Sequence, residues 1–247
     1  MPSYPHSRRR HWRTSLLLSL VVWGSSVLGQ VVNVTGRTQI QHGSKLTNTP
    51  DVVVWLEPLP SESHSPIAGN DRWPSHPRLT QHNKHFEPHI LVVPVGASVE
   101  FPNRDPFFHN VFSLFDGKRF DLGLYEAGTT RDVHFDKPGI SYIFCNIHPE
   151  MSAVVIALDT PYYAVSTRHG ELTMPDVPSG RYMLHIWSES SLPDALKGMT
   201  RQVTISTGNS SLGVIHLAET QVAVTHKNKY GRDYDPPSPP SPVYEQP

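Results

Sequence analysis

Proline is the residue that most limits what this chain can fold into. The 247 residues include 24 prolines, roughly double the usual share of ~5%, and proline inside a helix removes a hydrogen bond and clashes with the preceding turn. No stretch of helical length shows an apolar stripe with the helical period. Short β-branched and aromatic runs recur instead between Gly, Pro and Asn, so the sequence predicts an all-β protein.

The expected strands are short and evenly spaced, which favours β-sandwiches. At about 100–200 residues per domain, the chain can form one large domain or two small ones. The expected strands are Val31–Val34, Val52–Leu56, His89–Val95, Ser98–Phe101, Asn110–Ser113, Thr130–Phe135, Ser141–Cys145, Ala153–Leu158, Glu171–Met174, Tyr182–Trp187, Gln202–Ile205 and Gly213–Leu217.

The N-terminus has the layout of a secretory signal peptide. Arginines without a neighbouring acid precede an apolar run from Leu16 to Val22, which continues to Gly29. We expect cleavage after Gly29, so that residues 1–29 are removed and the protein is periplasmic or secreted; an uncleaved anchor is the alternative. The run is shorter than the ~20 apolar residues of a membrane span, and we expect no stable span after cleavage.

Charge and composition also limit the partners and the ordered length of the chain. After the N-terminal arginines the chain is mildly acidic, which predicts no binding to nucleic acid. Residues 225–247 are rich in proline and nearly free of aliphatic side chains. We therefore expect a disordered, polyproline-like tail there.

Cys145 is the single cysteine of the chain. It cannot form an internal disulfide, and zinc or iron–sulfur sites with several cysteines are excluded. A free thiol is unusual in an exported protein, because oxidising compartments favour disulfides. A metal-ligand role for Cys145 would explain it.

A short loop after Cys145 carries further donor side chains. In Cys145-Asn-Ile-His148-Pro-Glu-Met151, a thiolate, an imidazole and a thioether follow one another at steps of three residues. Copper that changes oxidation state suits a plane of two histidines and a cysteine with a weak axial methionine. His109, at the start of a strand-like run upstream, would complete this set. Taken singly, an inert cysteine, a strand histidine and a core methionine are the alternatives.

The segment around this motif resembles the cupredoxins, the small blue-copper proteins related to plastocyanin and amicyanin. The resemblance covers residues 80–159. It rests on the strand pair in residues 88–101, on the step His109-Asn110-Val111, and on the Cys-x-x-His-x-x-Met loop, whose spacing is closest to amicyanin. Leu114–Gly128 has no counterpart in this resemblance.

The resemblance implies a Greek-key β-sandwich with one type 1 copper ion bound by His109, Cys145, His148 and Met151. It also implies that the backbone amide of Asn110 donates toward the Cys145 sulfur, a contact that tunes the reduction potential. His148 would be the ligand near solvent through which electrons pass. No ligand position departs from the family pattern.

His82, His85 and His89 are close enough in sequence to suggest a second metal site. The chain has 15 histidines, so a chance cluster is the alternative. The sequence alone does not decide between them.

The segments that flank the copper motif predict a second β-sandwich. Val165–Trp187 contains a hairpin, a turn with proline and glycine, and an alternating strand, and it resembles the carboxypeptidase regulatory-like, or transthyretin-like, β-sandwich modules. We expect residues 31–58 and 160–219 to form one such Ig-like sandwich, interrupted by a linker at 59–79 and the copper module. Two unrelated β segments are the alternative.

The expected function is that of an exported type 1 copper protein that shuttles single electrons. Its redox partners would dock weakly near His148 and Pro149. We expect no enzymatic activity, because copper oxidases and nitrite reductases would need His-x-His pairs and a second copper domain, which the sequence lacks. The alternative is an interaction, glycan-binding or copper-handling protein without an electron-transfer role.

Overall fold

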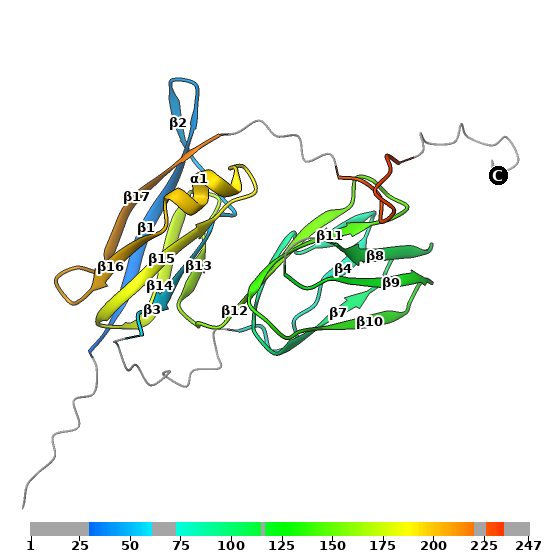
Figure 1. Cartoon of the computed structure of the whole chain (residues 1–247), viewed down its shortest axis with the longest axis horizontal. Coiled ribbons are helices and arrows are strands. Elements are labelled where there is room, and N and C mark those ends of the chain that lie inside the picture. The colour runs from blue at the N-terminus through cyan, green and yellow to red at the C-terminus, as the bar shows by residue number, and fades with distance from the viewer. Residues whose placement is uncertain (1–29, 61–72, 115–116, 220–225, 235–247) are drawn as a thin grey trace, which may run out of the picture.

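A computed structural model describes residues 30–60, 73–114, 117–219 and 226–234 (Figure 1). The expected signal peptide, most of the linker and the end of the tail lie outside the described residues. Strands account for nearly all regular structure in the described part, with one short helix, α1 (Pro193–Gly198). The all-β fold class is confirmed.

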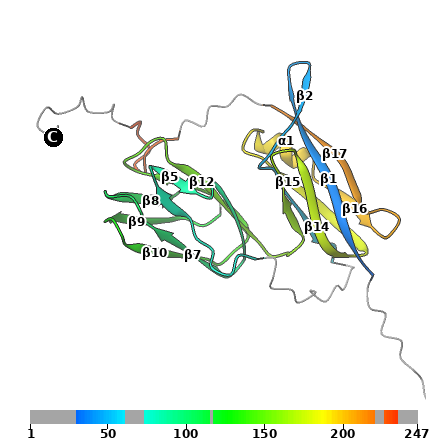
Figure 2. The same cartoon turned by 180° about the vertical axis from the view of Figure 1, so that it is seen from behind.

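Strands from both ends of the chain form two sheets, which we call the outer sandwich (Figure 2). In one sheet, β1 pairs antiparallel with β2 and β14 and parallel with β17. The other sheet has the order β13-β3-β15-β16. Their bounds are β1 Val31–His42, β2 Lys45–Asn48, β3 Val53–Pro58, β13 Tyr163–Val165, β14 Glu171–Pro178, β15 Gly180–Trp187, β16 Arg201–Ile205 and β17 Ser211–Ala218.

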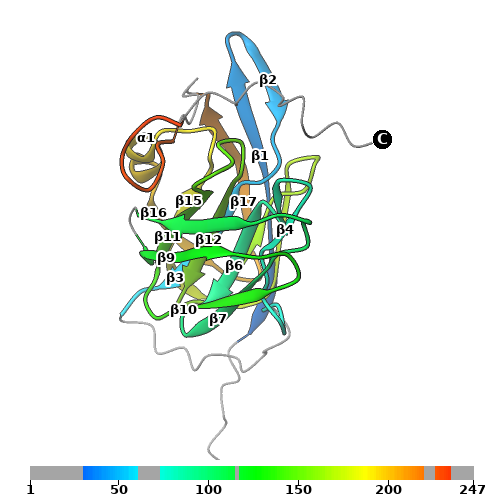
Figure 3. The same ribbon diagram turned by 90° about the vertical axis from the view of Figure 1, so that its right-hand side faces the viewer.

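The strands between β3 and β13 form the inner sandwich. Its largest sheet has the order β6-β12-β11-β8-β9, beside the pairs β10-β7 and β4-β5. The bounds are β4 Thr80–His82, β5 His85–Glu87, β6 Ile90–Pro94, β7 Ala97–Pro102, β8 His109–Ser113, β9 Phe120–Tyr125, β10 Thr130–Phe135, β11 Gly139–Cys145 and β12 Ser152–Leu158. In Figure 3 the strands of the inner sandwich lie in front of those of the outer sandwich.

Two hydrophobic cores follow from the alternation of side chains along the strands. The core of the outer sandwich includes Val54, Leu56 and Leu184, and that of the inner sandwich includes Phe101, Phe135 and Ile143. All six side chains are buried.

Strand β12 belongs to both cores. Its residues Val154 and Ile156 pack into the outer core, whereas Ala153, Val155 and Ala157 pack into the inner core. A strand covered on both faces is expected to be continuously apolar, which is the case for Ala153–Leu158. This strand therefore forms a wall shared by the two sandwiches.

No helix of the described residues combines the length and the hydropathy that crossing a bilayer requires.

Candidate metal centre

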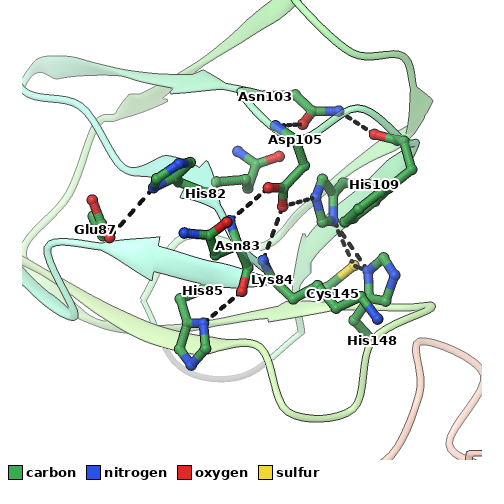
Figure 4. A network of polar contacts seen from close by, with 12 residues as sticks. His82, Asn83, Lys84, His85, Glu87, Asn103, Asp105, His109, Cys145 and His148 are labelled. Carbon is green, nitrogen blue, oxygen red and sulfur yellow. Dashed lines mark hydrogen bonds and ion pairs between the residues drawn. The ribbon is translucent and has the colours of Figure 1, made fainter.

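The donor side chains lie at one end of the largest inner sheet. His109 is the first residue of β8 and Cys145 is the last residue of β11. The two strands are antiparallel neighbours, with Cys145 opposite Val111. His148 lies in the ligand loop, residues 146–151, which connects β11 to β12. Figure 4 shows the two imidazoles and the thiol converging.

The three donor atoms are close enough to share one metal ion. Nδ1 of His109 and Nδ1 of His148 are 3.2 Å apart, and each is 3.5 Å from Sγ of Cys145. Nitrogen and sulfur bound to one ion at about 2.0 Å and about 2.3 Å stand roughly 3.3–3.5 Å apart at tetrahedral angles. Among the described residues, this is the group of three donors that could hold a metal.

The protonation states of the histidines suit metal binding. Burial lowers the pKa of His109, although the neighbouring Asp105 carboxylate opposes this. Burial also lowers the pKa of His148, and proximity to His109 adds to the effect. Both imidazoles are therefore neutral at about pH 7 and offer a lone pair.

When no metal is bound, the side chain of Cys145 is a protonated thiol. Its side chain is fully buried, and burial raises its pKa. Metal binding must then release the thiol proton, because the thiolate is the ligand. Copper, zinc and other metals that accept soft and imidazole ligands fit this donor set.

Backbone amides around the sulfur oppose the effect of burial. The N–H groups of Asn110, Ile147 and His148 donate to the Cys145 side chain and lower its pKa, because they favour the anion.

Asn110 also connects the two halves of the site. Its side-chain Nδ2 donates to Oδ1 of Asp121 on β9 at 2.7 Å. Its carbonyl accepts a hydrogen bond from the N–H of Asn146 at 2.8 Å. The strand that carries His109 is therefore bonded directly to the ligand loop.

Asp105 fixes the orientation of His109. Its Oδ2 lies 2.9 Å from Nε2 of His109, and both side chains are buried. An Nε2–H that donates to the carboxylate leaves the Nδ1 lone pair facing Cys145 and His148. Sequence reasoning missed Asp105; the available signal was an acid four residues before a ligand histidine.

The β4–β5 hairpin holds the Asp105 carboxylate in turn (Figure 4). Asn83 and Lys84 adopt positive φ of 51° and 56°, the conformation of a two-residue hairpin turn. Their N–H groups donate to Oδ1 at 2.5 Å and to Oδ2 at 3.0 Å. Burial opposes ionisation, but the amide of Lys84 and the His109 ring hold the pKa of Asp105 below its usual range.

The backbone of Met151 is bonded to two of the donor residues, and the ring of Phe107 lies beside both histidine rings. Met151 is completely buried, its N–H donates to the carbonyl of His148 at 3.1 Å, and its carbonyl accepts from the N–H of Cys145 at 3.3 Å. The ring of Phe107 is 5.4 Å from the ring of His109 and 5.4 Å from that of His148. The axial role of Met151 stays a prediction.

The histidines suggested as a second metal site do not converge. Nδ1 of His82 lies 3.8 Å from Glu87, and Nδ1 of His85 bonds to the carbonyl of Asn83 at 2.7 Å. Nε2 of His89 bonds to Glu189 at 2.6 Å. The three-donor group in the described residues does not include them, so a second metal site there stays a hypothesis without support from the geometry.

Part of the expected tail lies on the metal site. The sequence predicts disorder from residue 225 onward, yet residues 226–234 contact the ligand loop, with His226 bonded to the carbonyl of Pro149 at 2.7 Å. Composition did not predict this because two rings, those of His226 and Tyr234, supply contacts that aliphatic content does not measure. The remainder, 235–247, lies outside the described residues.

No protein-family model matches this chain, and no curated protein matches it. Several solved structures are similar. A purple cupredoxin from Nitrosopumilus maritimus is 23% identical with a TM-score of 0.31, over 33% of this chain and 99% of its own. A reduced amicyanin mutant is 21% identical with a TM-score of 0.32, over 44% of this chain and 99% of its own.

A copper-containing nitrite reductase from Thermus scotoductus is also similar. It is 25% identical with a TM-score of 0.33, over 38% of this chain but 25% of its own length. At TM-scores this low, the case for a metal centre rests on the side-chain geometry of this chain. That geometry supports a site in which two imidazoles and one thiol bind a single ion.

Proposed function

We propose that this chain is an exported type 1 copper protein that transfers single electrons between redox partners. In this proposal His109, Cys145 and His148 bind one copper ion and Met151 is the weak axial ligand. A copper ion so bound supplies a reversible one-electron couple. The protein then needs no substrate pocket and acts on no substrate.

The observation that carries the proposal is the convergence of two neutral imidazoles on a buried thiol. Their donor atoms lie 3.2–3.5 Å apart. The carboxylate of Asp105 contacts Nε2 of His109, the ring nitrogen that does not face the other donors. Such support limits movement of the ligands when the charge of a metal changes. A small change in ligand position favours electron transfer over chemistry on a substrate.

We propose the end of the inner sandwich near His148 and Pro149 as the docking surface. Large apolar side chains are exposed around the site: Phe108 is 51% exposed, Ile147 44% and Leu124 61%. Phe108 precedes one ligand histidine and Ile147 precedes the other. A small apolar patch of this kind supports brief encounters, which electron-transfer complexes require.

The ligand assignment is tested by titrating the metal-free protein with Cu(II). The proposal expects one Cu(II) per chain and an intense visible band from the thiolate, which Cys145→Ser abolishes without loss of the β-sheet circular dichroism signal. His148→Ala should weaken Cu(II) binding strongly, whereas His85→Ala, an exposed histidine of the hairpin, should not. An intense band that survives in Cys145→Ser would overturn the assignment.

Copper handling without electron transfer is the second candidate. It is favoured by the outer sandwich, whose strands contribute none of the three donors and which an electron carrier does not need. Reversible reduction of the copper-loaded protein distinguishes the two, because a buffer or carrier of copper has no need of fast reversible cycling.

A further inference from the structure

The segment 226–234, which we call the C-terminal strap, contacts the ligand loop at several points. Nε2 of His226 donates to the carbonyl of Pro149 at 2.7 Å, the N–H of Lys229 donates to Oδ1 of Asn146 at 2.9 Å, and the hydroxyl of Tyr234 donates to the carbonyl of Cys145 at 2.8 Å. These bonds reach Cys145, the first loop residue Asn146, and Pro149 in the second half of the loop. The strap (red in Figure 1) lies against the end of β11.

Aromatic stacking adds an apolar component to this contact. The ring of His226 is stacked on Phe144, with centroids 4.0 Å apart and planes at 22°. The ring of Tyr234 meets that of His226 edge to face at 5.2 Å. Phe144 directly precedes the ligand Cys145, so the strap also covers the strand that presents the thiol.

The strap also reaches β9, the strand that pairs with β8, which carries His109. Nζ of Lys229 forms an ion pair with Oδ2 of Asp121 at 2.8 Å. The other oxygen of Asp121 accepts from Asn110 at 2.7 Å, and the backbone amide of Asn110 donates to the Cys145 sulfur. Lys229 is therefore bonded directly to the ligand loop through Asn146 and indirectly, through Asp121, to the strand that carries His109.

The strap has a turn of its own, which lowers the entropy cost of its ordering. The N–H of Gly231 donates to the carbonyl of Asn228 at 2.9 Å, and Oδ1 of Asn228 accepts from the N–H groups of Tyr230 and Arg232 at 3.0 Å and 3.1 Å. The N–H of Asn228 donates back to the carbonyl of Arg232 at 2.9 Å. The turn therefore presents Lys229 in a fixed position.

Contacts from the C-terminal strap can stabilise the ligand loop, because much of the loop faces solvent. Ile147 is 44% exposed, and Pro149 and Glu150 are exposed as well. We propose that the C-terminal strap is an intramolecular clamp that holds the ligand loop in its donor-presenting conformation before metal binds. Lys229 and Tyr234 are then positioning residues for Cys145 and His148.

The proposal rests on the metal-binding role proposed above, but its first test needs no metal. Hydrogen exchange is measured on the metal-free full-length protein and on the double variant Lys229→Met/Tyr234→Phe. The amides of Asn146 and Met151 should exchange about tenfold faster in the variant, because two contacts of ordinary strength are lost. The matched control is Lys227→Met/Tyr230→Phe, which changes the exposed lysine and tyrosine of the same segment.

Amides of β12 show whether a change is confined to the loop. Exchange in the loop that is equal in all three proteins overturns the clamp. If the amides of β12 also exchange faster in the double variant, the test uses the single variant Tyr234→Phe, which keeps the aromatic ring. Exchange of its loop amides is then compared with that of the wild type. Unchanged loop exchange in that variant also overturns the proposal.

Zn(II) affinity provides a readout that depends on ligand position. A loop that must be ordered on binding lowers affinity, so Zn(II) should bind about tenfold more weakly to the double variant than to the control. Equal Zn(II) affinities contradict the positioning role. Faster loop exchange in the variant, together with a wild type that stays colourless with Cu(II), would keep the clamp and reject the copper function.

Discussion

Asp105 connects the local structure of the inner sandwich to the chemistry of the proposed copper ligands. Its carboxylate accepts hydrogen bonds from the turn amides of Asn83 and Lys84 and from the ring of His109. A carboxylate buried with that many donors stays ionised, and a histidine held by it keeps one tautomer. The geometry of the donor triad thus depends on a residue that does not itself contact the metal position.

Asp105→Asn tests this dependence. The asparagine side chain lacks the negative charge, and its NH₂ group would face the N–H groups that donate to Asp105 in the wild type. The His109 ring therefore loses its fixed orientation. We expect Zn(II) or Cu(II) affinity to fall about 10–100-fold. Competition titration against a chelator measures this, and Asp136→Asn, a change at an exposed carboxyl, is the control. Unchanged affinity in Asp105→Asn would show that the carboxylate does not orient the ligand.

Met151→Leu tests the axial assignment. Leucine keeps most of the buried volume but removes the thioether, a donor that favours the oxidised metal. The copper-loaded variant should keep its colour and show a higher reduction potential in a voltammetric titration. A potential equal to that of the wild type would remove Met151 from the site.

Motif spacing predicted the donors His109, Cys145 and His148, and the structure brings these three together. Asp105 and Tyr234 could not be predicted in the same way. One acts through a hairpin turn more than 20 residues upstream, and the other contacts Cys145 from 89 residues downstream. Such contacts depend on tertiary structure, which local patterns do not encode.

At the scale of elements, strand β12 determines how the two sandwiches meet. Ile156 is fully buried in the outer core, whereas its neighbour Val155 is fully buried in the inner core. Apolar side chains on both faces explain the unbroken run Ala153–Leu158, which the sequence analysis assigned to a strand.

Ile156→Ala should therefore weaken the contact between the cores and leave the donors in place. We expect the free energy of unfolding to fall by about 2–5 kcal/mol, the usual cost of such a cavity. Urea unfolding measures the loss, and metal affinity should stay unchanged. Val214→Ala, at a site that is 46% exposed, should cost less than about 0.5 kcal/mol. Equal stabilities of the two variants would contradict the shared-wall role of β12.

Long apolar strands were predictable, and short polar ones were not. The strands expected from the sequence include the central residues of β6, β11 and β12, but not the hairpin β4–β5 or the strand β9, which lies in Leu114–Gly128. Strand β9 alternates weakly in burial, and β4 and β5 are each three residues long. These strands form because they pair with neighbouring strands, and the alternation of apolar residues along the sequence does not reveal such pairing.

At the scale of the whole molecule, His89 and Glu189 join the two sandwiches. His89 precedes β6 of the inner sandwich and Glu189 follows β15 of the outer one, with Nε2 and Oε2 2.6 Å apart. The hydrogen bond to Glu189 raises the pKa of His89, although burial opposes the effect. The pair therefore contributes a pH-dependent part of the contact.

The sign of this dependence follows from the raised pKa of His89. The stabilisation is fully present below the unfolded-state pKa of about 6.5 and is lost as pH rises through the higher folded-state value. Glu189→Gln should lower the free energy of unfolding by about 0.2–1 kcal/mol at about pH 6, since the pair is partly exposed. At about pH 9 the charge-dependent part of the difference in unfolding free energy between wild type and Glu189→Gln should vanish.

Urea unfolding at both pH values checks the prediction, with Glu126→Gln, a change at an exposed carboxyl, as control. A difference between wild type and Glu189→Gln that is the same at both pH values would show that protonated His89 does not stabilise the contact.

The most direct test of the central claim is a reductive titration of the Cu(II)-loaded full chain, followed by visible absorption and electron paramagnetic resonance. The account predicts an intense blue band with a type 1 resonance signal, which ascorbate bleaches and reoxidation restores over repeated cycles. A colourless protein, or one whose Cu(II) signal does not respond to ascorbate, would contradict an electron-transfer role for His109, Cys145 and His148.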